Sequence, residues 1–408
     1  MNKRQFLKST LGLSLTPSLV NLLRQPAAAD DETFWAQVRS AYRLKPDYIN
    51  LENGYYNILP EETLENHFKH IREINYQGAY YMRTAQFSDR KAMSQLVADI
   101  VQCPPDDLIL TRNTTESLDM IIGGYPWQSG DEAVFAIQDY GAMQDMFDQV
   151  ARRHGVVLKK LSLPMHPAND EEIVNLYARA ITPKTKLLMV CHMVNITGQI
   201  LPIRKICDMA HAKGVEVMVD GAHAVAHIEF NLLDLHCDYY GASLHKWLAV
   251  PLGVGMLYVK PEHVNKIWPV FAENESSAKG IERLNHLGTN PVHAHLAIKD
   301  AVHFYRQLGP ARKEARLRYL QQYWTSQVRN IPGINVNTPA DPTRHGAIAN
   351  VGISKLKPAE LAKRLLDEFN IYTVAIDGND VHGCRITPNV FTSIAELDQL
   401  VRALKALA

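Results

Sequence analysis

The sequence predicts an α/β protein with a large domain built on a mainly parallel β-sheet and a smaller α+β domain. Between about Leu108 and Val259, short apolar runs rich in Val, Ile, Leu and Met alternate with helix-like segments, as in parallel sheets. From about Val292 a long helical stretch leads into a few short strands. The chain has 408 residues, 46% of them hydrophobic and 21% charged, which is long enough for about two domains.

The clearest strand–helix–strand unit lies in the middle of the chain. An apolar strand is expected at Leu187–Cys191, and Pro202 marks the first turn of the helix that follows. The segment Ile203–Ala210 places its apolar residues on one helical face, and Gly214 ends the helix before the next strand, Val215–Val219. Units of this kind bind ligands at the carboxyl ends of their strands.

The C-terminal part has a different pattern. A long helical stretch is expected at His293–Val328, followed by strands near Ala347–Ile353, Ile371–Ala375 and Cys384–Thr387. Ser393–Glu396 reads as a capping box that opens the last helix.

These patterns divide the chain into four parts. We expect an export signal at residues 1–29 and an N-terminal segment that packs with the small domain at residues 30–60. The large domain then covers residues 61–291, and the small α+β domain covers residues 292–408.

The first residues have the three-part composition of an export signal. Residues 1–8 are basic, residues 9–23 are moderately apolar, and Ala27–Ala29 offers small residues at a cleavage point. Lys3–Lys8 resembles a twin-arginine signal with Lys in place of the first Arg, which implies the twin-arginine export machinery and a periplasmic or secreted protein. The alternative is an amphipathic N-terminal arm. The apolar part is too short for a stable membrane span.

Charge and cysteine content exclude several classes of partner. Lys plus Arg (43) equals Asp plus Glu (43), so no basic field is present to hold nucleic acid or an anionic membrane. The five cysteines show no C-x-x-C spacing, which argues against a zinc site or a disulfide framework. We therefore expect a small-molecule partner and no metal.

Three features of the sequence indicate chemistry. Asp220 ends an apolar strand, Lys246 follows between apolar residues, and Thr114 and Thr115 open a helix directly after the strand Leu108–Thr111. A buried carboxylate requires a cationic partner, and hydroxyls with backbone N–H groups at a helix start bind anions. Taken singly, each feature has a simpler alternative: a carboxylate that caps a turn, a solvated lysine and an ordinary helix cap.

In this order and spacing the three features resemble the class V aminotransferase family, which includes cysteine desulfurases, kynureninases and isopenicillin N epimerase-like enzymes. Gln138–Met143, His192–Gly198 and Leu287–Asn290 also match the family's motifs, so the resemblance covers nearly the whole chain after the signal. It implies fold type I of the pyridoxal 5′-phosphate (PLP) enzymes, with PLP bound by the large domain and an amino acid as substrate.

The resemblance implies that Lys246 holds PLP as a Schiff base and, once released by the substrate amine, acts as general base at Cα. Asp220 would keep the pyridine nitrogen protonated, so that the ring accepts electrons. Tyr140 would stack on the ring. The other implied cofactor-binding residues are Thr114, Thr115, Ser243 and His245 at the phosphate, and Asn195 and His223 at the phenolic oxygen.

Two further residues carry implied roles. Thr289 matches the threonine that family members donate to the phosphate of the neighbouring subunit, which implies a homodimer with shared active sites. Arg385 matches the small-domain arginine that binds the substrate carboxylate, a task suited to a planar guanidinium. The alternative for Arg385 is a surface arginine at a strand end.

The sequence departs from the desulfurase pattern in three places. Tyr140 stands where desulfurases have a ring-stacking histidine, and His223 stands where they have glutamine. The segment Ala375–Gly383 is short and lacks the nucleophilic cysteine, and we predict that Cys384 is a packed strand residue.

The run Tyr140–Met143 and the short segment Ala375–Gly383 most resemble the isopenicillin N epimerase-like branch of the family. We expect an amino-acid epimerase or carbon–sulfur lyase that acts through an external aldimine and a Cα carbanion. The alternative is a transaminase with two half-reactions. A cysteine desulfurase and a non-catalytic PLP-binding protein rank below both.

Overall fold

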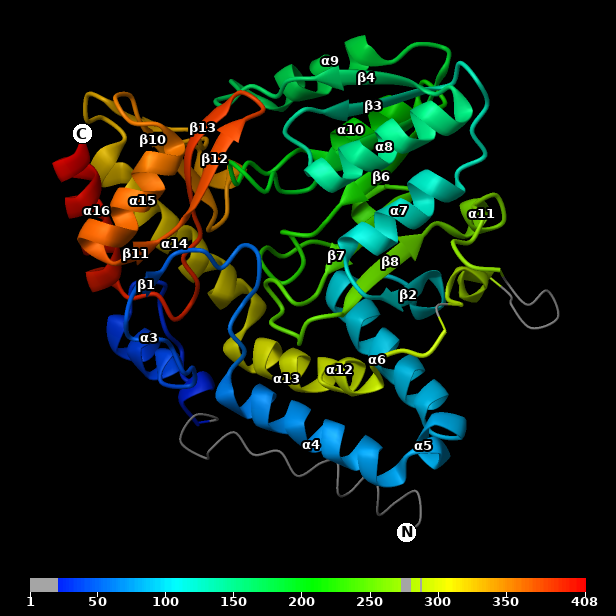
Figure 1. Ribbon diagram of the computed structural model, residues 1–408, viewed down its shortest axis with the longest axis horizontal. Helices are drawn as coiled ribbons and strands as arrows, with labels where there is room; N and C mark the ends of the chain where they lie inside the picture. Colours follow the sequence, from blue (N-terminus) through cyan, green and yellow to red (C-terminus); the bar gives the residue numbers. More distant parts are fainter. Residues whose placement is uncertain (1–20, 273–279, 287) are drawn as a thin grey trace.

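A seven-stranded sheet forms the centre of the larger part of the chain (Figure 1). The computed structural model describes residues 21–272, 280–286 and 288–408, so most of the predicted export signal lies outside the described residues. Only β8 runs against the other strands, which confirms the predicted mainly parallel sheet. In spatial order the strands are β2 (Leu108–Thr111), β8 (Gly255–Val259), β7 (Tyr239–Ser243), β6 (Glu216–Asp220), β5 (Thr185–Cys191), β3 (Glu132–Ala136) and β4 (Val157–Leu161).

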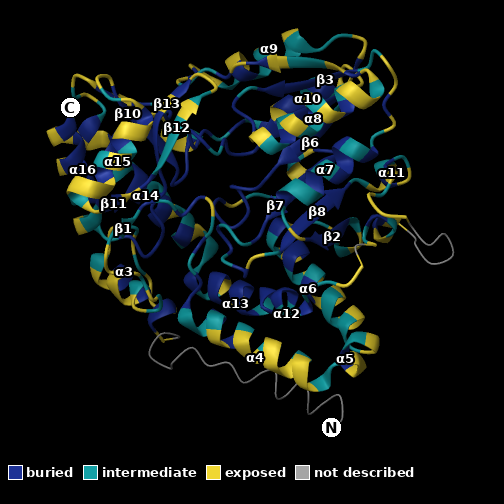
Figure 2. Cartoon of the chain, viewed as in Figure 1, coloured by how far each residue is buried: buried dark blue, intermediate teal, exposed yellow. Residues whose placement is uncertain are grey.

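Helices cover both faces of this sheet, and its strands are largely buried except for β4 at one edge (Figure 2). Because side chains alternate along a strand, Val217 and Val219 belong to one core cluster and Met218 to the other. The helices on the first face are α6 (Gln86–Val101), α9 (Asp170–Ala180), α10 (Ile203–His211), α12 (Val292–Leu296) and α13 (Ile298–Leu308). On the second face lie α7 (Thr114–Gly124), α8 (Gly141–His154) and the short α11 (Pro261–Val264).

The C-terminal part has its own four-stranded antiparallel sheet with a separate core cluster. The strand order is β12 (Val374–Gly378), β13 (Val381–Ile386), β10 (Ala349–Ile353) and β9 (Ile334–Val336). Its helices are α14 (Pro310–Val328), α15 (Pro358–Phe369) and α16 (Ile394–Leu407). Ser393 and Glu396 form the predicted capping box at the start of α16.

The N-terminal segment lies against the C-terminal part (Figure 1). Its strand β1 (Ile49–Asn50) pairs in parallel with β11 (Ile371–Tyr372), and Arg39 of α3 (Glu32–Arg39) binds both carboxylate oxygens of Glu396 at 2.7 and 2.8 Å. The next helices, α4 (Glu61–Gln77) and α5 (Ala79–Arg83), lead to α6, and α12 and α13 pack against α4 and α6. The four domain limits stay a prediction.

The predicted unit in the middle of the chain is confirmed as β5, α10 and β6. Two predicted elements were wrong in extent. The helical stretch His293–Val328 is three helices: α12 ends at Leu296, and Gly309, with a positive φ of 88°, ends α13. The strand Ile371–Ala375 is divided between β11 and β12, which belong to different sheets.

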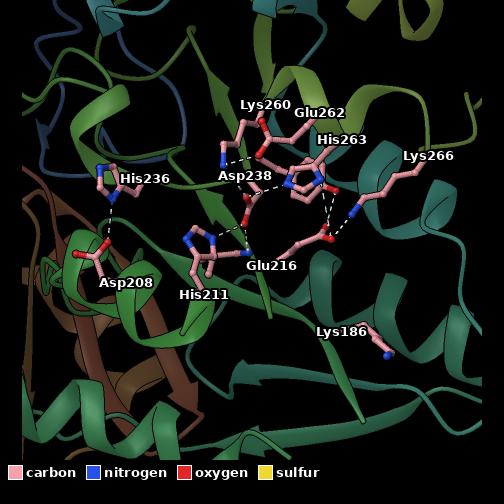
Figure 3. A network of polar contacts seen from close by, with 12 residues as sticks. Lys186, Asp208, His211, Glu216, His236, Asp238, Lys260, Glu262, His263 and Lys266 are labelled. Atoms are coloured by element: carbon pink, nitrogen blue, oxygen red, sulfur yellow. Dashed lines mark hydrogen bonds and ion pairs between the residues drawn. The ribbon is translucent and has the colours of Figure 1, made fainter. Parts of the chain in front are cut away.

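A network of hydrogen bonds and ion pairs joins residues at the amino-terminal ends of β6 and β7 (Figure 3). The buried Asp238 carboxylate contacts His211 at 2.8 Å and His263 at 3.0 Å, and it accepts the N–H of Val217 at 2.7 Å. Within the described ranges, no helix is long and apolar enough to cross a membrane, and no cluster of three or more His, Cys, Asp or Glu residues could hold a metal ion.

Candidate active site

Most of the predicted site residues follow the carboxyl ends of parallel strands. Tyr140 follows β3, Asn195 follows β5, and Asp220 is the last residue of β6. Lys246 lies three positions beyond β7, and Thr114 opens α7 just after β2. Since β2, β3, β5, β6 and β7 run in one direction, these residues lie along one edge of the sheet.

The Lys246 amine lies in a dense set of contacts. Its Nζ is 3.1 Å from Nε2 of His223, and Trp247 Nε1 donates to the other ring nitrogen of His223 at 3.3 Å. Asn57 donates to the Lys246 carbonyl at 2.6 Å and so fixes the backbone. Burial, opposed by Asp220 and reinforced by Arg385, lowers the pKa of Lys246 to about 8. The amine can therefore gain or lose a proton near neutral pH.

Asp220 supplies a buried negative charge beside this amine. Its Oδ1 accepts the N–H of Ala222 at 2.9 Å, and burial raises the pKa of the carboxyl above its usual range, while Lys246 opposes that shift. The intervening Gly221 has no room for a side chain, because a Cβ there would lie 2.0 Å from the Tyr240 ring. The turn after β6 therefore requires glycine.

The two histidines beside Lys246 are held in their neutral form. Burial, with the nearby Lys246 amine, lowers the pKa of His245 to about 4 and the pKa of His223 well below its usual value. A neutral imidazole can both donate and accept hydrogen bonds. Nδ1 of His245 and Oδ1 of Asn195 are buried without a hydrogen-bond partner within the described structure.

The predicted anion site joins two distant segments. Ser243 Oγ accepts the N–H of Thr114 at 2.9 Å and lies 2.7 Å from the Thr114 hydroxyl. Asn113 caps α7 by accepting the N–H of Glu116 at 2.8 Å. Thr115 is half-buried in the same first turn. Hydroxyls and a capped helix start thus lie together, as an anion requires.

Two predicted residues lie outside these contacts. Tyr140 opens α8 and is 43% exposed, so its ring presents a free surface in the single chain. Thr289 is exposed in the segment that leads into α12. Its implied role depends on a second subunit.

Arg385 of β13 does not lie free at a strand end. Its guanidinium forms a buried ion pair with Glu52, with Nε 3.1 Å from Oε2, and Nη1 donates to the Asn195 carbonyl at 3.2 Å. Arg385 therefore contacts the segment after β5 through the Asn195 carbonyl, and its implied role at the substrate carboxylate stays a prediction. Glu52 is absent from the residues predicted from the sequence, because the short segment around it has no periodic pattern or motif.

Comparison with known proteins gives relatives over nearly the full length. Isopenicillin N epimerase from Streptomyces clavuligerus is 29% identical over 399 residues, covering 91% of this chain and 98% of that protein. The isopenicillin N epimerase of Amycolatopsis lactamdurans is 29% identical over 404 residues, covering 92% and 99%. The cysteine desulfurase CsdA of Escherichia coli is 30% identical over a shorter stretch of 242 residues, covering 57% and 59%.

Solved structures share the fold. A variant of C-DES with glycine covalently linked to its PLP cofactor superposes with a TM-score of 0.81 at 20% identity, covering 90% of this chain and 98% of that one. The crystal structure of Escherichia coli CsdA gives a TM-score of 0.79 at 22% identity, covering 91% and 98%. These similarities confirm fold type I.

The aminotransferase class-V family profile matches residues 61–403. That range contains the sheet, the Lys246 region and the small-domain strand that carries Arg385. The chain belongs to the class V aminotransferase family.

Proposed function

We propose that this protein is a PLP-dependent enzyme that acts at the Cα of an amino acid, as an epimerase or a carbon–sulfur lyase. The observation that carries the proposal is the placement of Lys246. Its amine has a pKa lowered to about 8 and lies 3.1 Å from the neutral His223. The buried carboxylate of Asp220 interacts electrostatically with this amine. An amine in this state can bind a carbonyl group and move a proton.

The residues present fit PLP. The cofactor carries a phosphate, a protonatable ring nitrogen and a phenolic oxygen. The site offers a hydroxyl-lined helix start at Thr114 and the Asp220 carboxylate. It also contains two buried polar atoms without a hydrogen-bond partner within the described structure, Asn195 Oδ1 and His245 Nδ1. When bound, PLP supplies a ring that takes up the electrons left when a bond at Cα breaks. Asp220 would hold a proton at the ring nitrogen, and Tyr140 would cover one ring face.

Lys246 is the residue best placed to move the Cα proton. A base with a pKa near the working pH is the most effective general catalyst. Asn57 holds the Lys246 backbone and His223 contacts Nζ, so both ends of the side chain have a defined position. Epimerisation requires removal of the Cα proton on one face and delivery of a proton on the opposite face, whereas β-elimination requires removal of the Cα proton and departure of the sulfur group from Cβ with its bonding electrons.

The structure argues against a desulfurase. The strands β12 and β13 are joined by a tight turn at Asn379 and Asp380, both with positive φ, and Gln138 donates to the Asn379 carbonyl at 3.1 Å. Cys384 is a fully buried residue of β13, as predicted, and burial raises the pKa of its thiol to about 11. A thiol in this state is a poor nucleophile.

The first experiment locates the cofactor. Holoenzyme is reduced with borohydride and digested, and the labelled peptide is identified by mass spectrometry. We expect the label on Lys246, and Lys246→Ala should lose both the label and the activity while it stays folded. A label on another lysine contradicts the proposed site.

The second experiment identifies the reaction. All amino acids, in both configurations and including cystine, are screened for a change in the visible spectrum of bound PLP. Chiral analysis, exchange of the α-hydrogen in D₂O and release of sulfide or an oxo acid then separate epimerase from lyase. Accumulation of the pyridoxamine form with a single amino donor would instead favour a transaminase.

We also propose that the enzyme is a homodimer in which Thr289 completes the phosphate site of the other subunit. Large apolar side chains are exposed on α4, α5 and α6, and Figure 2 shows exposed residues along these helices; neighbouring exposed apolar side chains are typical of a protein interface. These side chains are Phe68, Ile71, Tyr76, Tyr80 and Phe87. Light scattering should give twice the chain mass, and Tyr76→Glu with Phe87→Glu should give a monomer that binds PLP weakly.

We propose, finally, that the protein is exported by the twin-arginine route. The support is the composition of residues 1–29. Leu22 and Leu23 are buried against the body of the protein, and Arg316 donates to the Ala29 carbonyl at 2.9 Å, so N-terminal sequencing of mature protein is needed to place any cleavage. Lys3→Gln with Arg4→Gln should trap the protein inside the cell; equal export would refute the route.

A further inference from the structure

The ion pair between Glu52 and Arg385 joins the N-terminal segment to the small-domain sheet. Glu52 Oε2 accepts Nε–H of Arg385 at 3.1 Å, and the other carboxylate oxygen accepts from Nη2. The side chains are 6% and 9% exposed. An internal carboxylate therefore already occupies one edge of the guanidinium that is implied to bind the substrate carboxylate.

Glu52 is fixed from several sides. Its own N–H donates to Asn50 Oδ1 at 3.0 Å, and its Oε1 accepts the N–H of Tyr55 at 3.1 Å. Its backbone forms a parallel bridge with Thr387, two residues beyond Arg385. The carboxylate thus belongs to a hydrogen-bonded turn and is held in place.

The backbone of the same turn, at Gly54, packs against the guanidinium. A Cβ at Gly54 would lie 3.2 Å from Cζ and 3.3 Å from Nη2 of Arg385, so the guanidinium packs closely against the bare backbone there. Asn53 and Gly54 donate their N–H groups to the Thr387 hydroxyl at 2.6 and 3.1 Å. These hydrogen bonds join the turn to the residue that directly follows β13, the strand that carries Arg385.

Breaking this pair would be unfavourable. A substrate carboxylate that displaced Glu52 would restore a partner to Arg385 but would leave Glu52 buried with only the Tyr55 N–H. Removing one partner of a buried ion pair is strongly destabilising, because the other charge is left uncompensated. The pair is therefore expected to persist when substrate binds.

Arg385 retains donors for a second carboxylate. A guanidinium has five N–H donors. Glu52 takes one from Nε and one from Nη2, and the Asn195 carbonyl takes one from Nη1. One N–H on each terminal nitrogen is left over, and these two atoms suit the two oxygens of a carboxylate.

We propose that Glu52 is a positioning residue for substrate recognition: it holds the Nε–Nη2 edge of Arg385, so that the substrate carboxylate binds through the remaining donors of Nη1 and Nη2. This inference rests on the proposed function, in which Arg385 binds that carboxylate. Glu52 acts through Arg385 and does not contact the substrate.

The test is a set of variants measured as PLP-loaded holoenzyme. Propionate, which has a carboxylate but no amino group, is titrated and followed through the pH titration of the visible cofactor band. Glu52→Gln should weaken propionate binding at least tenfold, or about 1.4 kcal/mol, because the amide places N–H groups against the guanidinium. Glu52→Asp should lie between the wild type and Glu52→Gln.

The same change should separate the steady-state constants. With the substrate found in the amino-acid screen, Glu52→Gln should raise KM by a similar factor and change kcat less than threefold. The thermal midpoint and the cofactor band show whether each variant is folded. In the Arg385→Leu background, Glu52→Gln should cause no further weakening, since a residue that acts through Arg385 has no separate effect.

Several results would overturn the inference. Tighter propionate binding by Glu52→Gln would show that Glu52 competes with the substrate for Arg385, and unchanged binding would show that it does not orient the guanidinium. If the wild type does not bind propionate, the remaining N–H groups on Nη1 and Nη2 of Arg385 do not bind a carboxylate, which also contradicts the inference. If Arg385→Leu binds propionate as well as wild type does, the assigned role of Arg385 fails, which is a distinct outcome.

Discussion

Replacing Lys313 by methionine should change the pH dependence of stability in a calculable way. Lys313 lies on α14, is 7% exposed, and donates from Nζ to the carbonyl of Trp247, the residue after Lys246. Its Nζ is 5.4 Å from the centroid of the Tyr305 ring. Burial lowers the pKa of Lys313 to about 7, whereas an unfolded lysine titrates near 10.4. Folding therefore carries a free-energy cost at pH 7, because the protonated amine of Lys313 is less favourable in the folded protein than in the unfolded chain.

The sign follows from proton counting. Between about pH 7 and pH 10 the unfolded chain holds more protons at Lys313 than the folded chain, so stability rises with pH. At 1.36 kcal/mol per pKa unit, the cost is about 4 kcal/mol at pH 7 and about 2 kcal/mol at pH 9. Methionine removes this cost, but it also removes the hydrogen bond to the Trp247 carbonyl, which contributes about 1 kcal/mol at every pH. Lys313→Met should thus be more stable by about 3 kcal/mol at pH 7, and by about 1 kcal/mol at pH 9.

The assay is denaturant unfolding of both proteins at pH 7, 8 and 9. Lys246 also titrates in this range, but it is present in both proteins and cancels in the difference. Lys91→Met is the matched control, because Lys91 is 82% exposed and should show no pH-dependent difference from wild type. Parallel curves for wild type and Lys313→Met would refute the argument, since they would show that Lys313 keeps an ordinary pKa in the fold.

Three further predictions concern single residues. Asp220→Asn should keep bound PLP but slow turnover on the order of a hundredfold or more, because a neutral amide cannot stabilise a protonated ring nitrogen; near-normal turnover would assign that task to another group. Cys384→Ala should retain activity with every amino acid tested, and loss of turnover with cysteine but normal folding would revive the desulfurase hypothesis. Asp238→Asn should destabilise the fold at pH 7. Burial raises the pKa of Asp238, but the contacts with His263, the Val217 N–H and His211 outweigh burial and lower the pKa below its usual value. The stabilisation therefore exists above about pH 4 and is lost as the pH falls further. A stability difference that is unchanged between pH 7 and pH 3 would contradict this.

The parallel core could be predicted because its signal is local. Each strand of the unit around α10 is an apolar run, and the helix between them has its apolar residues on one face, so β5 and β6 were located within two residues. Breaks in the long helical stretch were missed because apolar periodicity continues through them. Pro310, directly after Gly309, was the available signal for the start of α14.

Sequence motifs indicated the candidate site residues one at a time, but not the contacts between them. The order of the strands places Thr114 beside Ser243 only because β8 returns antiparallel between β2 and β7, and no local pattern encodes that pairing. The partner of Arg385 was missed for a similar reason. Glu52 lies 333 positions earlier in the chain, in a segment whose only strand, β1, has two residues. Long-range charge pairs of this kind are specified by the tertiary fold.

In the proposed function, substrate recognition and cofactor binding depend on different contacts. Asp220, His223 and Lys246, the residues proposed to act at the cofactor, come from the large sheet and its connections. Arg385 comes from the small-domain sheet, is held by Glu52 of the N-terminal segment, and reaches the large domain through the Asn195 carbonyl. Changes at the junction of these three segments should alter affinity for the substrate carboxylate, while changes along the edge of the large sheet should alter the chemistry at Cα.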